Sequence, residues 1–159
     1  MKRIISIISL IALLAAACVL SACSGGSGGS GGEEDGQNPV MNFIGEYACD
    51  RAVVLVEAGE GNSATVTVTW GSSAWESSEW VMSGEFDENT LTIEYRNCVR
   101  TDHVYKSDGT VELENVMYED GGGFIVFSEG DGLSLVWEDD QEHVADGMVF
   151  TYVYEEADE

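Results

Sequence analysis

The densest group of potential ligand atoms in the chain is an acidic segment close to the C-terminus. It reads Glu138-Asp139-Asp140-Gln141-Glu142-His143, and Asp146 and Gly147 follow it. Carboxylates so close together repel one another, and a hard cation such as Ca²⁺ relieves that repulsion by binding their oxygen atoms. The expected calcium ligands are Asp139, Asp140, Glu142 and Asp146, although their spacing does not match an EF-hand loop. The alternative is a solvated loop between the last two strands.

Three tryptophans, Trp70, Trp75 and Trp80, form a second group that could bind a ligand. Trp75 lies among serines and a glutamate, with little apolar sequence nearby, so it either covers one end of the fold or presents an aromatic face to a sugar or peptide. Trp70 and Trp80 flank this loop, and tryptophans at strand ends usually pack in the core. We therefore expect a ligand contact at Trp75, with Trp70 and Trp80 beside it or in the core.

The sequence offers little for catalysis. Its two histidines are His103 and His143, and it contains no His-Glu-x-x-His motif, no phosphate-binding loop and no Cys-x-x-Cys pair. Lys106 is the only lysine after Lys2 and lies beside a polar turn, which disfavours a buried lysine nucleophile. We expect a protein that is not an enzyme, and a hydrolase with scattered catalytic residues remains the alternative.

The N-terminal segment has the layout of an export signal. Lys2 and Arg3 precede an almost wholly apolar run, residues 4–20, and small residues follow. The stretch Leu20-Ser21-Ala22-Cys23 resembles the lipobox of bacterial lipoproteins. This resemblance implies cleavage before Cys23, acylation of its thiol, and anchoring on the outer face of the cell membrane. Cys18 matches the lipobox less well because Ala15 replaces leucine, and an uncleaved membrane helix is the other alternative, at the short end of the usual span.

Composition divides the chain into four parts. Residues 1–22 form the expected signal peptide, 23–37 the lipidated cysteine and a flexible acidic linker rich in glycine and serine, 38–155 one folded domain, and 156–159 an acidic tail. A flexible linker of this length has an r.m.s. reach of about 20 Å. It would therefore hold the domain away from the lipid surface.

The charge of the chain is strongly negative. All 30 acidic residues follow Cys23, and only four of the six basic residues remain after the signal is removed, a formal charge of −26 (4 minus 30). Such a field repels nucleic acid and anionic lipid, so the expected partners are cations, cationic proteins or neutral small molecules. The alternative explanation is solubility alone.

Cys49 and Cys98 are the two cysteines left in the exported domain. An even pair outside the cytoplasm predicts a disulfide, which would stabilise the fold by roughly 4 kcal/mol. Cys98 has the same parity as polar positions of its strand, so the bond would lie on the outer face or need a bulge. Two free thiols are the alternative.

Apolar and polar residues alternate along most of the domain, which predicts half-buried β-strands. Residues 65–70, 80–86, 91–96, 111–114, 124–127, 133–137 and 148–154 follow this pattern, and glycine-rich or Asx-rich turns separate them. Residues 50–58 are compatible with a short helix. The fold class is therefore all-β: an antiparallel meander of eight or nine strands that closes into a barrel, with a β-sandwich as the alternative.

The first strand carries two further resemblances. Asn42-Phe43-Ile44-Gly45-Glu46-Tyr47 is similar to the opening of lipocalin-like barrels, with Tyr47 at their tryptophan position. Tyr47-Ala48-Cys49 resembles a Tyr-x-Cys segment of small lipid-anchored barrels that inhibit lysozyme. The expected function is a barrel that binds a ligand or partner at one mouth, with Trp75 and its loop or residues 138–147 as the contact region. The second resemblance implies the alternative, an inhibitor of a cationic enzyme such as lysozyme.

Overall fold

The alternating sequence folds into eight β-strands in a computed structural model that describes residues 38–154. The predicted signal peptide, Cys23, the linker to residue 37 and the tail at 156–159 lie outside the described residues. The elements are η1 (Pro39–Asn42, a 3₁₀ helix), β1 (Gly45–Cys49), β2 (Ala52–Ala58), β3 (Ser63–Gly71), β4 (Glu76–Asp87), β5 (Thr92–Tyr105), β6 (Val111–Ser128), β7 (Ser134–Asp139) and β8 (Val149–Tyr152).

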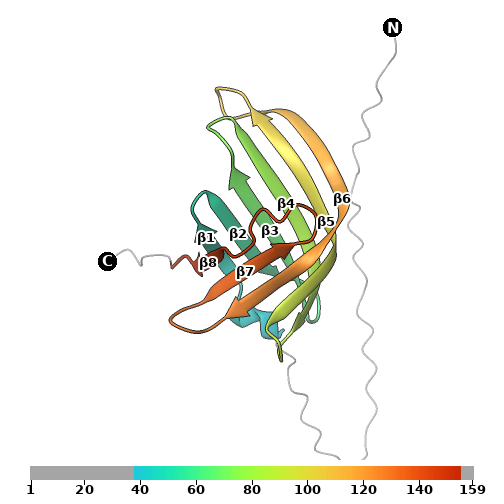
Figure 1. The fold of residues 1–159 in the computed structure, drawn as a ribbon, viewed down its shortest axis with the longest axis vertical. Helices are drawn as coiled ribbons and strands as arrows, with labels where there is room; N and C mark the ends of the chain where they lie inside the picture. Colours follow the sequence, from blue (N-terminus) through green and yellow to red (C-terminus); the bar gives the residue numbers. More distant parts are fainter. Residues whose placement is uncertain (1–37, 155–159) are drawn as a thin grey trace, which may run out of the picture. The chain divides into compact units, whose positions relative to one another are not determined.

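Every strand is antiparallel to its neighbours in sequence, and β8 pairs with β1 to close the ring (Figure 1). This confirms the predicted all-β meander, with eight strands. The ring is uneven, because β4, β5 and β6 are much longer than the others. Its closure is narrow: β8 meets β1 only at the pairs Tyr47–Tyr152 and Ala48–Thr151.

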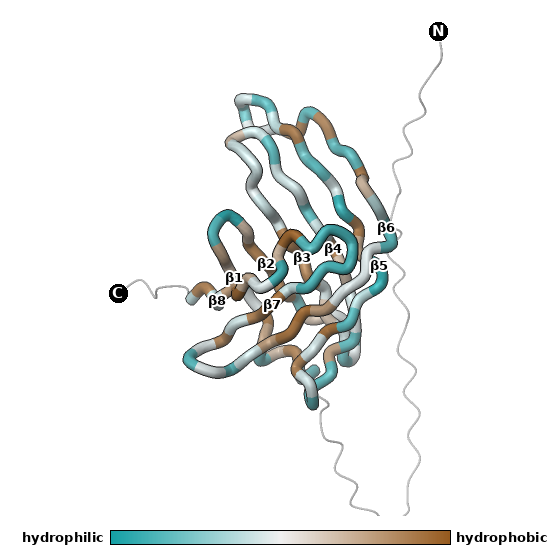
Figure 2. Tube along the Cα trace, in the orientation of Figure 1, coloured by the Kyte–Doolittle hydropathy of each residue, from teal (hydrophilic) through white to brown (hydrophobic). Residues whose placement is uncertain are grey.

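The core lies inside the ring and is filled with apolar side chains. Along the strands, hydrophobic and hydrophilic residues alternate (Figure 2). Val66 and Val68 are fully buried on β3, whereas the threonines between and beside them reach the outer side. Burying a large apolar side chain contributes roughly 1.5–3 kcal/mol. The largest members of the core are Trp137, Tyr47, Tyr95, Phe86, Phe150 and Met82.

Buried polar atoms of the core are paired. The Tyr47 hydroxyl donates to the carbonyl of Phe43 at 2.9 Å, and Trp137 Nε1 donates to the Tyr95 hydroxyl at 2.8 Å. Unpaired, such groups would each cost about 1–3 kcal/mol. Burial and the neighbouring Tyr152 raise the pKa of Tyr47, so this hydroxyl stays protonated.

The predicted strand at 111–114 and the one at 124–127 are parts of a single strand, β6. The sequence Gly121-Gly122-Gly123 separates them and interrupts the apolar alternation. A Cβ at Gly121 would lie 2.7 Å from the Tyr118 ring, so the small residue allows the strand to pass close to its neighbours. Residues 52–58, considered as part of a short helix, form strand β2.

Cys98 faces the core, so of the two expected arrangements, an outer-face position or a bulge, the structure has the bulge. Arg96 and Asn97 are both exposed, and the register between β5 and β6 shifts between Tyr95 and Cys98. A β-bulge therefore reverses the parity of the rest of β5. Cys98 is fully buried as a result, and burial raises the pKa of its thiol from 9.0 to about 12.

The predicted disulfide is absent, because Cys49 and Cys98 are both free cysteines in the structure. Cys49 ends β1 and Cys98 lies on β5, which is the fourth strand further around the ring. Neither strand pairs with the other, and a disulfide needs Cα atoms within about 7 Å.

The two ends of the ring differ. In an antiparallel meander, every link from an odd strand to the following even strand lies at one end. Residues 72–75, 106–110 and 140–148 are such links, and we call this the extension end. Residue 38 enters at the opposite end, the entry end, where η1 buries Val40 against the core.

At the extension end, the sheet continues beyond the short strands. We call residues 76–81 of β4, 99–105 of β5 and 111–118 of β6 the extension (Figure 1). Strand β7 pairs with β6 only over Gly123–Ser128, so it does not reach this part. Across residues 38–154, the structure contains no helix with the length and apolar character needed to cross a membrane.

Candidate binding site in the extension

Pairing between strands places three rows of side chains on the inner face of the extension. Residues opposite one another in an antiparallel pair project to the same face. Arg100 of β5 lies between Trp80 and Tyr118, Asp102 lies between Ser78 and Asn115, and Val104 lies between Glu76 and Leu113. The β5 bulge sets this arrangement, because without it Arg100 and Asp102 would project to the outer face.

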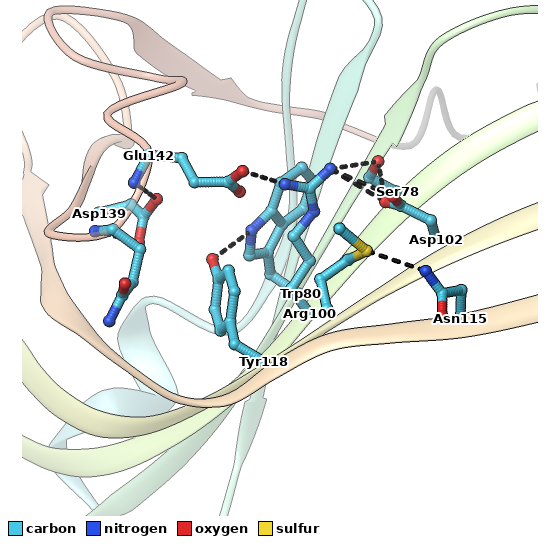
Figure 3. A network of polar contacts seen from close by, with 10 residues as sticks. Ser78, Trp80, Arg100, Asp102, Asn115, Tyr118, Asp139 and Glu142 are labelled. Atoms are coloured by element: carbon cyan, nitrogen blue, oxygen red, sulfur yellow. Dashed lines mark hydrogen bonds and ion pairs between the residues drawn. The ribbon is translucent and has the colours of Figure 1, made fainter.

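Arg100 is the centre of a polar network on this face (Figure 3). Its Nη2 lies 3.0 Å from Asp102 Oδ1 and 3.4 Å from Ser78 Oγ, while Nη1 donates to Glu142. Ser78 Oγ also donates to Asp102 Oδ1 at 2.7 Å. Burial acts to lower the pKa of Arg100, but the hydrogen bonds to Glu142 and Asp102 outweigh it and raise the pKa.

Arg100 also stacks on an aromatic side chain. Its Cζ lies 5.1 Å from the centre of the Trp80 ring, within the range of a cation–π contact. Trp80 Nε1 in turn donates to the Tyr118 hydroxyl at 2.9 Å, and its ring meets Trp137 edge-on at 5.2 Å. The network therefore connects the inner face of the extension to the barrel core.

The loop at 140–148 reaches Arg100 through Glu142. Asp139, which is buried, accepts hydrogen bonds from the backbone N–H groups of Gln141 and Glu142 at 3.2 and 2.9 Å. Ala145 of the same loop is buried in the core. The loop thus covers this end of the barrel and holds the Glu142 carboxylate against the guanidinium (Figure 3).

The predicted calcium ligands are not brought together. Among residues 38–154, no group of three or more histidine, cysteine, aspartate or glutamate side chains is arranged to hold a metal ion. Asp139 bonds to its own loop, Glu142 pairs with Arg100, and Asp146 lies 3.3 Å from His143 Nδ1. The structure therefore does not bear out the calcium prediction, because internal partners already occupy three of the four carboxylates.

The three tryptophans do not form one ligand-binding face. Trp80 is buried, and Trp70 is half-buried against the core, as their strand-end positions predicted. Trp75 is 51% exposed, and its carbonyl accepts a hydrogen bond from the backbone of Tyr105 at the far end of β5. Only Trp75 is therefore available at the surface, at the tip of the extension.

His103 lies on the outer face of the extension, where Ser77 and Glu114 flank it on the neighbouring strands. Its ring nitrogens are 3.8 Å from Glu79 and 3.6 Å from Glu114. His143 belongs to the covering loop, so the two histidines lie in different elements.

A groove of about 350 Å³ runs along the extension beside the Arg100 network. Glu76, Asp102 and Leu113 line it, together with Ser72 and Asn115. A larger open groove, about 980 Å³, lies around the turn between β4 and β5, and Glu85, Asp87, Glu88 and Glu94 border it with Arg96 as its only basic residue. The smaller groove therefore carries Arg100 and His103 beside two carboxylates, whereas the larger one has four carboxylates and one arginine.

Sequence reasoning did not identify Arg100, Asp102, Ser78 or Tyr118. One signal was present: Arg100 is one of only four basic residues after Cys23, and it lies within a strand of an acidic chain. Its inward orientation could not be read from the alternation, because the bulge comes first. Comparisons with protein-family models, with curated proteins and with solved structures gave no match for this chain.

Proposed function

We propose that this chain is a lipid-anchored lipoprotein on the outer face of a bacterial cell membrane, and that it is a binding protein and not an enzyme. Its partner is a cationic protein or peptide, which it binds at the extension end. The lipobox-like sequence that ends at Cys23 supports the anchor. The fold supports a binding site at the end away from the anchor. Residue 38, which follows the expected linker, enters at the end of the barrel opposite to the extension.

The observation that carries the proposal is the composition of the extension. Within residues 72–81 and 99–120, eight acidic side chains stand against two basic ones, Arg100 and Lys106, and Arg100 is already paired with Asp102 and Glu142. Clustered charge of one sign attracts partners of the other sign and accelerates their association. The acidic residues are Glu76, Glu79, Asp102, Asp108, Glu112, Glu114, Glu119 and Asp120.

The packed core favours a surface partner over a ligand held inside the barrel. Trp80, Trp137 and Tyr95 fill the interior below the extension and are at most 2% exposed. A barrel that encloses a ligand leaves space at this position. Native mass spectrometry tests this part of the proposal, and a co-purified small molecule retained by the folded barrel would contradict it.

Binding to a cationic partner is tested by its dependence on salt. We expect the purified chain to bind polylysine and a cationic protein such as lysozyme, with affinity that falls at least about tenfold between low and moderate ionic strength. An acidic protein of similar size serves as the control. No binding to either cationic probe at low salt would contradict the proposal, and lost lysozyme activity on binding would identify an inhibitor.

The anchor is tested separately in the expressing bacterium. Globomycin, which blocks lipoprotein signal cleavage, is expected to cause the precursor to accumulate, and Cys23→Ser is expected to abolish lipid labelling. Cys18→Ser is the matched control and leaves labelling intact. Unchanged processing in the presence of globomycin would contradict the lipoprotein assignment.

A further inference from the structure

We infer that the free edge of β6, residues 111–118, binds an extended basic segment of the partner as an additional β-strand. This inference rests on the proposed function and specifies how the partner would be held. Strand addition uses backbone hydrogen bonds for affinity and alternate side chains for selectivity.

The first observation is the pairing of β6. It pairs with β5 from Val111 to Val126, but with β7 only from Gly123 to Ser128. Within the described part of the chain, no strand pairs with the other side of residues 111–118. Along this edge, alternating backbone N–H and C=O groups point away from β5, ready to pair with another extended chain.

The second observation is the character of the edge. Val111, Leu113, Val116 and Met117 are each between 45% and 57% exposed, although apolar residues of this size usually lie in the core. Leu113 pairs with Val104 on the inner face, whereas Val116 pairs with Thr101 and belongs to the outer face. Apolar side chains are therefore exposed on both faces of the edge, and an added strand would cover them.

The charge of the β6 edge determines which kind of strand can bind to it. Glu112, Glu114, Glu119 and Asp120 lie along this part of β6, and residues 111–120 contain no basic side chain. Two copies paired edge to edge would bring these carboxylates together, and like charges on neighbouring strands are destabilising. The same carboxylates attract a basic strand, so the occupant is a lysine- or arginine-containing segment of another protein, and not a second copy.

The groove predicts the pattern of that segment. Leu113 belongs to the inner face and lines the groove, where Arg100 already pairs with Asp102. Alternate side chains of an added strand would project to this same face. Apolar residues at alternate positions would therefore cover Leu113 on this face, and the intervening lysine or arginine residues would lie on the outer side, beside Glu112 and Glu114.

The experiment compares backbone-modified peptides on the full-length protein. The probe is a peptide of about ten residues that alternates lysine and valine, and its binding is measured by fluorescence anisotropy. Two derivatives carry N-methyl groups at alternate amides, one set on the odd residues and one on the even residues. We expect one derivative to bind at least about tenfold more weakly and the other to bind nearly as well as the parent, because only one set of amides faces β6.

Protein variants locate the site. Glu112→Lys combined with Glu114→Lys is expected to weaken binding of the parent peptide at least about tenfold, since attraction becomes repulsion. The matched control is Glu85→Lys combined with Glu88→Lys beside the larger groove, which makes the same change in net charge and is expected to alter binding less than about twofold. Circular dichroism verifies that both variants keep the β fold.

The outcomes separate the two proposals. Equal binding of both N-methylated peptides, or equal weakening by the two pairs of lysine substitutions, would overturn strand addition while leaving a cationic partner in place. If polylysine, lysozyme and the parent peptide all fail to bind at low salt, the proposed function itself fails. Concentration-dependent dimers lost on Glu112→Lys and Glu114→Lys substitution would overturn the choice of occupant.

Discussion

At the scale of single residues, Arg100 connects parts of the chain that are distant in sequence. It stacks on Trp80 of β4, pairs with Asp102 on its own strand, and holds Glu142 of the covering loop. Its side chain is only 16% exposed, so its charge is largely removed from water. Both carboxylates depend on this one cation, and the loop position depends on it as well.

Replacing Arg100 is therefore expected to destabilise the protein. Arg100→Leu leaves Asp102 and Glu142 without their cation and should lower the free energy of unfolding by about 2–4 kcal/mol, whereas Arg100→Lys should cost less because the charge remains. Urea unfolding measures both. Arg96→Leu is the control: Arg96 is 84% exposed and pairs with Glu94, so a change below about 0.5 kcal/mol is expected. Equal losses at positions 96 and 100 would contradict this view.

Cys98 gives the fold a sensitivity to alkaline pH. Burial raises the pKa of its thiol to about 12 in the folded protein, so the unfolded chain loses this proton first. The resulting stability is complete below the unfolded pKa and decreases as pH rises from about 9 toward 12. We expect the free energy of unfolding to fall by roughly 1 kcal/mol per pH unit above pH 9, before the buried tyrosines add to the slope.

Denaturant titrations between pH 8 and 10 measure this dependence. Cys98→Ala should flatten the slope, although it lowers stability at every pH by removing a core side chain. Cys49→Ala is the control because it leaves the buried thiol in place. An unchanged slope in Cys98→Ala would show that another group causes the alkaline destabilisation.

The candidate site was predictable only in part at this scale. Residues 138–147 were expected to form a contact loop, and Glu142 of this loop belongs to the Arg100 network. Sequence could not show that Asp139 turns back onto its own loop or that Glu142 meets an arginine 42 positions earlier. Long-range pairs of this kind depend on strand register, which the alternation does not specify.

At the scale of elements, the strands were predictable and their irregularities were not. Val66 and Val68 alternate with threonines, and this pattern alone identified β3. The bulge at Arg96 and Asn97 has no such signature, because two polar residues in a row also occur in turns. The Gly121-Gly122-Gly123 sequence resembled a break between strands, whereas in the structure it allows one long strand to pass close to β5 and the β7 side.

A substitution at Gly123 tests how much the close approach of β6 to β5 and β7 matters for stability. A Cβ on Gly123 would collide with the carbonyl oxygen of Glu138 and lie 2.8 Å from the Tyr95 ring. Gly123→Ala should therefore lower the free energy of unfolding by about 3 kcal/mol or more, as overpacking a rigid site does. Thermal and urea unfolding measure the loss.

Gly109 provides the matched control for that substitution. It lies in the turn between β5 and β6 with a φ of 80°, and an added Cβ would meet no atom within 4 Å. Gly109→Ala should cost only about 1 kcal/mol, from backbone strain alone. If both alanine variants lose the same stability, steric contact at Gly123 is not the cause.

At the scale of the whole molecule, the ring is joined least extensively at β8. This strand has four residues and meets β1 at two residue pairs and β7 at three, whereas β3 and β4 share nine pairs. Local opening requires least free energy where few backbone hydrogen bonds must break. The barrel is therefore expected to open first at β8.

Hydrogen exchange followed by mass spectrometry measures that opening. Amides of β8 should exchange at least about tenfold faster than the paired amides of β3. Peptides from β7 serve as the internal reference, because that strand keeps six pairs with β6. Equal protection of β8 and β3 would mean that the ring opens only by global unfolding.

The overall architecture followed from two properties of the sequence: period-two alternation and short turns. Short links force consecutive strands to be neighbours, and eight such strands can meet end to end. The extension did not follow from these properties, since it depends on the unequal lengths of β4, β5 and β6. Its charge, in contrast, was visible from composition alone.

The distribution of indole rings gives the molecule an intrinsic optical probe. Trp80 and Trp137 are enclosed and in contact with each other, Trp70 is half-buried, and Trp75 is half-exposed at the tip of the extension. A soluble quencher such as acrylamide would therefore reach Trp75 first, and shielding of its emission would report an occupant near the tip without any attached dye. Loss of folding would instead release the enclosed pair, so one spectrum distinguishes occupancy from denaturation.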